Sequence, residues 1–405
     1  MKIKMYLYIL ALTVFLGCWE NNNPPKDNRI LWETEIIGGD ETASDRILPL
    51  IFDDNVVISR ANFDRSQSAL MCFDKNTGTK KWEWTDTYFN SEGTEIPIEL
   101  YTKLLSYNNI IIGLDYNKMY GINANIGQTV WENEFDSQIS DRFFLYDDKV
   151  YMLKDDNYST NKLTFLELNP LDGSYNVFYD VQGYEEGYNI VSGPFLIYKN
   201  IVGDKCILHG VAHNKDLYTT NETWKYGMIC YNLDKQEIVF KQSYPYEVGL
   251  SYLYINDDKI YSTGNYFSQY ELSTGNLIEQ FKQDQSTIDY TTLYDYPYAY
   301  LMYNNTSNRL VKVNMITMKE VGRLSLDGDQ SYTIKEWKDD LYLHTRSGRI
   351  YVVDKDNFQV VEKITAPHYD ENSYYSFDEN FSIDEETGYM YCTDYKHLIC
   401  YDLNK

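Results

Sequence analysis

The chain has 405 residues, of which 61 are acidic and 36 are basic, so its formal net charge at pH 7 is −25. A negative field of this size repels the phosphates of nucleic acids and anionic lipid headgroups, and it argues against both as partners. The chain is rich in tyrosine, and helix signals are weak throughout. Short runs of Tyr, Ile, Val, Thr and Phe favour an all-β fold.

Residues 1–17 are predicted to be a secretory signal peptide. A short basic start is followed by an apolar run, Met5 to Leu16, that is too short for an ordinary membrane-spanning helix. The run ends in "FLGC", which resembles the bacterial lipobox, where the cysteine, here Cys18, is acylated and becomes the new N-terminus. Residues 18–28 are then the lipidated cysteine and a flexible tether, because they are polar and lack periodicity. An uncleaved anchor with an incidental cysteine is the alternative.

Residues 29–405 are predicted to form one domain in which two repeat units alternate. The first unit is an apolar strand ending in Asp or Asn, with a glycine four residues later and an aromatic residue eight residues later. Its clearest copies contain Asp74, Gly78 and Trp82; Asn123, Gly127 and Trp131; and Asn169 and Gly173. The acid or amide can bond the backbone two residues on, and glycine supplies a positive φ at the chain reversal. We expect the aromatic residue to pack between neighbouring sheets. Further copies, such as those around Asn314 and Asp354, have decayed.

The second unit is a tight turn between two strands, often with an Asp pair such as Asp53–Asp54, Asp147–Asp148, Asp257–Asp258 or Asp339–Asp340. We interpret these pairs as turn residues, because Asp is a good turn former, and not as paired catalytic acids or calcium ligands. Each period of about 47 residues holds four strands, A to D, which is typical of a β-propeller. We predict an eight-bladed β-propeller of four-stranded antiparallel blades; seven blades or a split count is the alternative.

The last predicted blade lacks its fourth strand. Residues 375–402 supply three strands, and the segment "RILWETEI", which contains Trp32, looks like the missing outer strand. The N-terminal strand is therefore predicted to close the last blade, so that the ring is held together non-covalently.

The Asp/Asn–Gly–Trp spacing resembles the PQQ-type propeller repeat, and an eight-bladed version on a lipobox tether is similar to the BamB outer-membrane assembly lipoprotein family. This resemblance implies a propeller anchored by lipid in the bacterial cell envelope, on the periplasmic or surface face of the outer membrane. In quinoprotein dehydrogenases the repeat tryptophans recur in most blades, and a vicinal cysteine disulfide supports the quinone. Here only Trp32, Trp82 and Trp131 hold the repeat position and no two cysteines are adjacent, so a quinone-dependent enzyme is less favoured.

The chemistry-bearing residues do not form a recognisable catalytic motif, so we expect no enzyme, no cofactor and no metal site. His209 and His213 are four residues apart, but on a strand they would lie about 13 Å apart, and we take them as surface or loop histidines. His344, His368 and His397 are assigned to different blades. Cys72, Cys230 and Cys400 occupy equivalent repeat positions, which favours small buried strand residues over disulfides.

One face of the predicted ring carries the long loops. The A–B and C–D turns lie at one end of the blades, and the insertions at 88–99, 181–189, 212–226 and 366–376 all fall at the other end. Long loops cost little stability and often carry function. The candidate binding residues on this face are Tyr88, Phe89, Glu92, Tyr184, Glu185, Tyr218, Trp224, Tyr369 and Tyr374.

Two functional classes fit these features. The first is a monomeric, non-catalytic scaffold that binds other envelope proteins through the loop face. The alternative is a propeller that binds a glycan or a small ligand; exposed apolar groups on a flat loop face favour the scaffold, whereas a central funnel lined by Trp, Asn and Asp favours the ligand.

Overall fold

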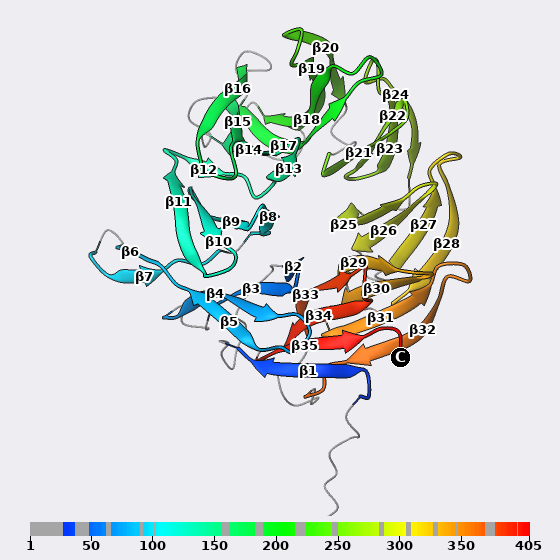
Figure 1. Ribbon diagram of the computed structural model, residues 1–405. Coiled ribbons are helices and arrows are strands. Elements are labelled where there is room, and N and C mark those ends of the chain that lie inside the picture. Colours follow the sequence, from blue (N-terminus) through cyan, green and yellow to red (C-terminus); the bar gives the residue numbers. More distant parts are fainter. Residues whose placement is uncertain are drawn as a thin grey trace, which may run out of the picture.

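Strands account for the regular structure in the computed structural model, which describes residues 27–36, 48–61, 66–89, 92–100, 102–155, 162–182, 189–214, 224–244, 250–282, 287–304, 309–326, 331–345, 347–368, 377–394 and 396–405. Eight antiparallel sheets stand around a central opening as the blades of a β-propeller (Figure 1). Among the described residues there is no helix with the length and apolarity that a membrane crossing requires. The predicted signal peptide, Cys18 and most of the tether lie outside these residues.

Blades 1 to 4 follow one another along the first part of the chain. Blade 1 contains β2 (Leu50–Phe52), β3 (Asn55–Ala61), β4 (Ser68–Asp74) and β5 (Lys80–Trp84). Blade 2 contains β8 (Leu105–Tyr107), β9 (Ile110–Asp115), β10 (Lys118–Asn123) and β11 (Gln128–Glu134). In blade 3 the inner strand is divided into β12 (Gln138–Ile139) and β13 (Phe144–Tyr146), followed by β14 (Lys149–Asp155), β15 (Lys162–Leu168) and β16 (Tyr175–Gln182). Blade 4 contains β17 (Asn189–Lys199), β18 (Lys205–Asn214), β19 (Trp224–Asn232) and β20 (Glu237–Tyr244).

Blades 5 to 8 complete the ring. Blade 5 contains β21 (Tyr252–Asn256), β22 (Lys259–Thr263), β23 (Phe267–Glu271) and β24 (Leu277–Phe281). Blade 6 contains β25 (Thr287–Asp295), β26 (Tyr298–Asn304), β27 (Arg309–Asn314) and β28 (Lys319–Ser325). Blade 7 contains β29 (Ser331–Trp337), β30 (Asp340–Thr345), β31 (Arg349–Asp354) and β32 (Gln359–Thr365). Blade 8 contains β33 (Phe377–Asp384), β34 (Tyr389–Asp394), β35 (His397–Asp402) and, as its outer strand, β1 (Ile30–Glu35).

The N-terminal strand closes the ring, as the sequence predicts. In blade 8 the strand order is β1-β35-β34-β33, and β1 pairs antiparallel with β35, so that the two ends of the described chain share one sheet (Figure 1). Opposite residues in this pair include Glu33 with Ile399 and Glu35 with His397. The eight-bladed fold and its closure by β1 are therefore confirmed.

The closing blade is also fastened to both neighbouring blades. Arg29 forms an ion pair with Glu362 on β32 of blade 7, with 2.8 Å between the charged atoms. On the other side, the indole nitrogen of Trp32 donates a hydrogen bond of 3.1 Å to the carbonyl of Lys75 in blade 1. The Lys75 ammonium itself forms a 3.1 Å ion pair with Asp384 in blade 8, and both side chains are largely buried. Ring closure thus depends on contacts that span three blades.

The first repeat unit locks each early blade onto the next one. The Asp74 carboxylate accepts hydrogen bonds from the backbone N–H groups of Asn76 and Thr77, and Gly78 completes the turn with a φ of +69°. A Cβ atom at Gly78 would lie 2.5 Å from the ring of Trp32, which belongs to the preceding blade. The tryptophan ring therefore needs a turn without a side chain beneath it.

The same contact recurs around the first half of the ring. Trp82 covers the turn glycine Gly127, and Trp131 covers Gly173; a Cβ atom would lie 2.5 Å from the first ring and 2.7 Å from the second. The two indole nitrogens donate to backbone carbonyls in the next blade, at 2.7 Å and 2.9 Å. Asn123 and Asn169 accept backbone hydrogen bonds in the same turns. The repeat residues thus occupy the turns and the aromatic contacts of three successive blade interfaces.

The Asp pairs lie in the tight turns, where the sequence places them. Asp53, Asp147, Asp148 and Asp257 all adopt a positive φ, which is the conformation that the first-to-second strand hairpins require. The pair at 339–340 differs slightly, because Lys338 has the positive φ and Asp340 is already the first residue of β30. The geometry matches the turn interpretation of these acids.

The cysteines at the repeat position are buried strand residues. Cys72, Cys230 and Cys400 have no exposed surface, and none of the cysteines in the described residues forms a disulfide. Burial raises the pKa of each of these three thiols to about 12, so they stay protonated and unreactive at neutral pH. The expectation that they fill the core is confirmed.

Candidate functional site

The structure describes only part of the predicted loop-face site. Tyr184, Glu185, Tyr218, Tyr369 and Tyr374 lie outside the described residues, and Trp224 is described only through its backbone, at the start of β19. The predicted residues that can be placed with their side chains, Tyr88, Phe89 and Glu92, come together in one projecting hairpin. The site that can be built from this prediction is therefore this hairpin.

The hairpin is the insertion between blades 1 and 2. It contains β6 (Thr87–Phe89) and β7 (Glu95–Pro97), which form their own two-stranded sheet. We name it the β6–β7 arm; it projects outward from the ring (Figure 1). The Thr87 hydroxyl donates a 2.7 Å hydrogen bond to the Glu95 carboxylate across the two strands, and the N–H of Ile98 bonds the Asp86 carbonyl at the base. The arm is thus a preformed element.

Two adjacent aromatic residues on the arm are exposed. Tyr88 is 47% exposed and Phe89 is 71% exposed, although neighbouring residues of a strand point to opposite faces. Both faces of the arm therefore offer an aromatic side chain to solvent. Exposed phenylalanine and tyrosine are typical anchors of protein interfaces, whereas the surrounding residues, including Glu92 and Glu95, give a polar and acidic rim.

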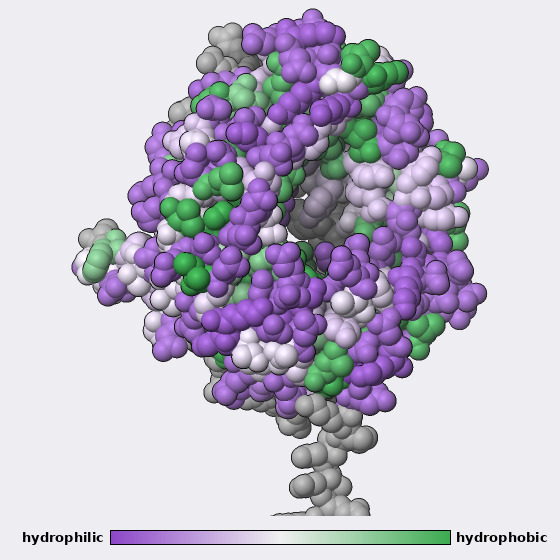
Figure 2. Space-filling view, viewed as in Figure 1, coloured by the Kyte–Doolittle hydropathy of each residue, from purple (hydrophilic) through white to green (hydrophobic). Residues whose placement is uncertain are grey.

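The centre of the ring contains a cavity that the sequence analysis did not assign to particular residues. Figure 2 shows a predominantly hydrophilic face that is hollowed at the centre. The cavity has a volume of about 570 Å³ and is lined by blades 1, 2, 6, 7 and 8. Its apolar lining comes from aliphatic residues such as Leu48, Leu50, Leu104 and Ile334. Its described lining contains no aromatic residue, so it differs from the Trp-lined funnel that the ligand-binding alternative anticipates.

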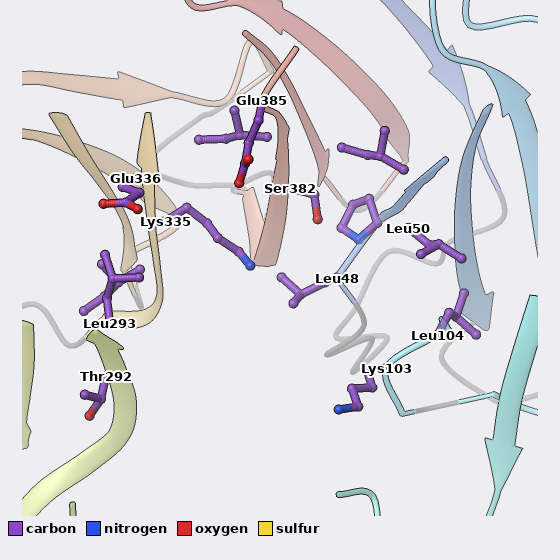
Figure 3. A pocket seen from close by; sticks show the side chains of 14 residues that line it. Leu48, Leu50, Lys103, Leu104, Thr292, Leu293, Lys335, Glu336, Ser382 and Glu385 are labelled. Atoms are coloured by element: carbon purple, nitrogen blue, oxygen red, sulfur yellow. The ribbon is translucent and has the colours of Figure 1, made fainter. Parts of the chain in front are cut away.

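Two lysines extend into this cavity. Lys103 reaches in from the segment before β8 and Lys335 from β29, on different sides of the space (Figure 3). The surrounding protein limits solvation of both ammonium groups and lowers their pKa values, while Asp141 opposes the shift at Lys103 and Glu385 opposes it at Lys335. Among the described residues neither lysine forms an ion pair, and the Lys103 ammonium lies 5.6 Å from the centre of the Phe143 ring. The cavity can therefore offer two positive charges to a ligand inside a strongly acidic protein.

Histidines that the sequence analysis assigns to different blades meet beside the closing strand. The rings of His368, which follows β32, and His397, on β35, lie 4.6 Å apart. His397 Nδ1 is 3.1 Å from the Asp394 carboxylate, and His368 Nε2 is 3.5 Å from the Glu33 carboxylate on β1. The two rings are therefore neighbours, although His368 follows blade 7 and His397 belongs to blade 8. The repeat pattern could not predict this proximity, because His368 lies in a connection between blades and outside the repeat units.

A third histidine is buried, which also differs from the expectation. His209 on β18 has no exposed surface, and its ring packs 5.1 Å from Phe165 and 5.7 Å from Tyr179. Burial lowers the pKa of its imidazole to about 3, so the ring is neutral at physiological pH. The assumption that His209 lies at the surface was wrong, because the strand alternation places it between blades 3 and 4.

Comparison with known proteins gives a likeness of fold. Neither protein-family models nor curated protein sequences match the chain. Among solved structures, it is similar to BamB from Moraxella catarrhalis, with a TM-score of 0.53, 11% identity and coverage of 92% of this chain and 99% of that one. The C-terminal WD40 domain of Sif2 gives a TM-score of 0.60 at 10% identity, covering 92% and 97%. A europium-containing methanol dehydrogenase gives 0.62 at 11% identity, covering 90% and 84%. At these identities the likeness shows a β-propeller.

Proposed function

We propose that this chain is a non-catalytic scaffold that binds another protein through the β6–β7 arm. The observation that carries the proposal is the pairing of a preformed projecting hairpin with two exposed aromatic residues, Tyr88 and Phe89. A propeller fold shared with BamB and a WD40 domain is consistent with a protein-binding role. Catalysis is not part of the proposal, because the described arm holds no set of acid, base and nucleophile.

The arm favours a partner that contributes an edge strand with a basic rim. A two-stranded sheet, whose strands pair only with each other among the described residues, leaves backbone N–H and C=O groups on its outer edges that can accept a further strand. Tyr88 and Phe89 then anchor the contact on either side. A net charge of −25 accelerates association with a basic surface and disfavours an acidic one.

Variants of the arm test this proposal. The native protein is crosslinked in its own envelope and captured, beside a variant that carries both Tyr88→Ser and Phe89→Ser. We expect one dominant protein partner that is lost in the double variant. Leu171→Ser, which changes an exposed residue in a turn at the other end of the blades, is the matched control and should keep the partner. A partner captured equally by all three proteins would contradict a role for the arm.

The proposed location is the bacterial envelope, with the propeller held by lipid on Cys18. The support is the sequence alone: a basic start, a short apolar run and a glycine–cysteine pair before a polar tether. Metabolic labelling with a radioactive fatty acid should mark the parent protein and leave the Cys18→Ser variant unlabelled. Label that persists in the variant would reject acylation at this residue.

A second candidate function is the binding of a small anionic ligand in the central cavity. The observation that favours it is the position of Lys103 and Lys335, which bring two ammonium groups into a space otherwise lined by aliphatic side chains, two hydroxyl groups and two acids. A ligand with an apolar body and one or two negative groups fits this lining better than a glycan that needs aromatic stacking.

This candidate is tested with a panel of small carboxylates and phosphate esters, with thermal stabilisation of the protein as the readout. A ligand of the cavity should raise the unfolding midpoint of the parent and have no effect on a variant carrying Lys103→Gln and Lys335→Gln. Lys338→Gln, at the exposed turn after β29, is the control for the loss of positive charge. Equal stabilisation of all variants would place the ligand elsewhere.

A further inference from the structure

We propose that His368, Asp394 and His397, with Glu33, form a binding site for a divalent transition-metal ion that fastens the closing strand. The ligand atoms of the first three residues all lie within 4.8 Å of one another. They come from the turn after β32, the end of β34 and the start of β35. Glu33 joins them from β1 through its contact with His368.

The spacing of the side chains suits zinc. A tetrahedral Zn²⁺ with bonds of about 2.0–2.1 Å holds neighbouring ligand atoms about 3.4 Å apart. His397 Nδ1 lies 3.3 Å from Asp394 Oδ2, and His368 Nε2 lies 3.5 Å from Glu33 Oε2. The distances between these two pairs need to shorten when an ion binds, and His368 itself lies in a turn after β32 rather than in a strand.

The chemistry of the donors agrees with the geometry. Two neutral imidazoles and two carboxylates offer nitrogen and oxygen ligands and balance the charge of one dication. Asp394 Oδ1 already accepts the backbone N–H groups of Lys396 and His397, at 2.8 Å and 2.6 Å, which leaves Oδ2 for the ion. These hydrogen bonds also orient the carboxylate in advance. His368 is 42% exposed, whereas Asp394 is fully buried, so an ion can enter from the histidine side.

The competing interpretation is a hydrogen-bond network without an ion. Asp394 would then be an ordinary turn acid, and His397 would only donate its Nδ1 proton to it. This accounts for Asp394 and His397. It does not account for the approach of His368 and Glu33 from two other segments, which brings a second imidazole and a second carboxylate beside the first pair.

The location gives the ion a structural role. Glu33 lies on β1, whereas His397 lies on β35, which pairs with β1, and Asp394 lies at the end of β34. An ion shared by these residues would tie the N-terminal strand to the rest of the blade. Because the ligands are brought together only in the folded ring, binding would stabilise the closed form and slow local opening of β1.

Zinc binding to the untagged protein is the test. After treatment with a chelator, the protein is incubated with Zn²⁺ and desalted, and the retained metal is measured by mass spectrometry. We expect about one equivalent per chain and a rise of about 3–5 °C in the unfolding midpoint at a zinc concentration 100 times the dissociation constant. Co²⁺ in place of Zn²⁺ should give the visible absorption bands of a four-coordinate site.

Three variants make the test specific. His368→Gln changes an exposed side chain, so the variant should fold normally but lose the retained zinc and the rise in midpoint. His397→Gln should also lose both. His213→Gln removes a histidine on β18 in blade 4 and should behave like the parent. Zinc retained equally by His368→Gln, or no zinc retained by the parent, would overturn the site.

Hydrogen–deuterium exchange separates the site from its structural role. Zinc should slow exchange of the β1 amides (Ile30–Glu35) in the parent and leave those of β18 unchanged. Bound zinc without slower exchange in β1 would overturn the proposed fastening. None of these readouts depends on the partner of the β6–β7 arm, so this inference and the proposed function can fail separately.

Discussion

Two blade interfaces, one between blades 1 and 2 and one between blades 6 and 7, pack a large side chain against a small one, but the two positions exchange roles. Between blades 1 and 2, Trp82 on the outer strand of the first blade covers the turn glycine Gly127 of the second. Between blades 6 and 7 the outer strand carries Gly322, and the turn carries Phe358; a Cβ atom at Gly322 would lie 2.8 Å from the Phe358 ring. Each of these interfaces needs one large side chain opposite one small residue. The large side chain can come from the outer strand of one blade or from the turn of the next blade.

The exchange explains why the repeat residues are lost from the later sequence units while the blades persist. Phe358 takes the turn position with a φ of +53°, and Met318 takes the equivalent position in blade 6 with a φ of +49°. Positive φ is costly for such residues, and burial of their side chains against the neighbouring blade offsets the cost. Blades 6 and 7 therefore keep the interlock without the glycine, whereas blade 5 still has Gly275 at this turn, against the ring of Phe240.

The largest expected effect comes from removing the closing strand. Deletion of residues 28–36 removes the outer strand of blade 8, the Trp32 contact and the Arg29 ion pairs. We expect a loss on the order of 5 kcal/mol or more in the free energy of unfolding, measured by chemical denaturation. A synthetic peptide of residues 27–36 should restore part of it. A truncated protein as stable as the parent would contradict closure by β1.

A smaller effect is expected at the regular interface. Gly127→Ala places a Cβ atom against the ring of Trp82 at a φ of +64°, and we expect a loss of about 2–4 kcal/mol. Gly203→Ala is the matched control, because Gly203 has a φ of +91° and no atom within 4 Å of the added Cβ. Its free energy of unfolding should fall only by the conformational cost of about 1–2 kcal/mol. Equal losses would mean that the tryptophan contact contributes nothing.

The exchanged interface can be tested by reversing it. Gly322→Phe and Phe358→Gly each leave two large or two small groups opposite each other, whereas the double variant restores one of each. We expect the double variant to be more stable than the sum of the single changes predicts, by about 1–2 kcal/mol in a double-mutant cycle. Strict additivity would show that the two positions do not share one packing space.

A third interface uses a buried histidine and should be sensitive to pH. Because the pKa of His209 is about 3 in the fold and 6.5 in the unfolded chain, the unfolded chain binds the extra proton below pH 6.5. The contribution of the buried His209 side chain to stability is therefore present above pH 6.5 and is lost as the pH falls toward 3. Between about pH 7.5 and about pH 5.5 the parent should lose about 1.3 kcal/mol more than His209→Phe. Identical pH profiles would contradict a neutral buried imidazole.

The architecture could be predicted from the sequence because short-range residue patterns determine the turns and the blade contacts. Asp74, Gly78 and Trp82 fall within nine residues, and each performs a local task in one turn and one contact. Closure by the strand around Trp32 followed from the count of units, since a blade without an outer strand needs one from elsewhere. Fold and closure are therefore properties that a periodic pattern can indicate.

The chemistry-bearing clusters could not be predicted in the same way. Lys103 belongs to a connection between repeat units. It lines the same cavity as Lys335 only because five blades are arranged around the ring axis. His368 also lies in a connection, and only the folded ring brings it to His397 and Glu33. Long-range proximity of this kind leaves no spacing signal in one sequence.

The most direct test of the account is site-specific photocrosslinking at Phe89 in the living cell. A photoreactive phenylalanine analogue replaces Phe89 at the exposed tip of β6, and in a parallel protein it replaces Leu171 in a turn of blade 3. We expect one dominant protein adduct at position 89 that is absent at position 171. No adduct at position 89, or the same set of adducts at both positions, would contradict partner binding through the β6–β7 arm.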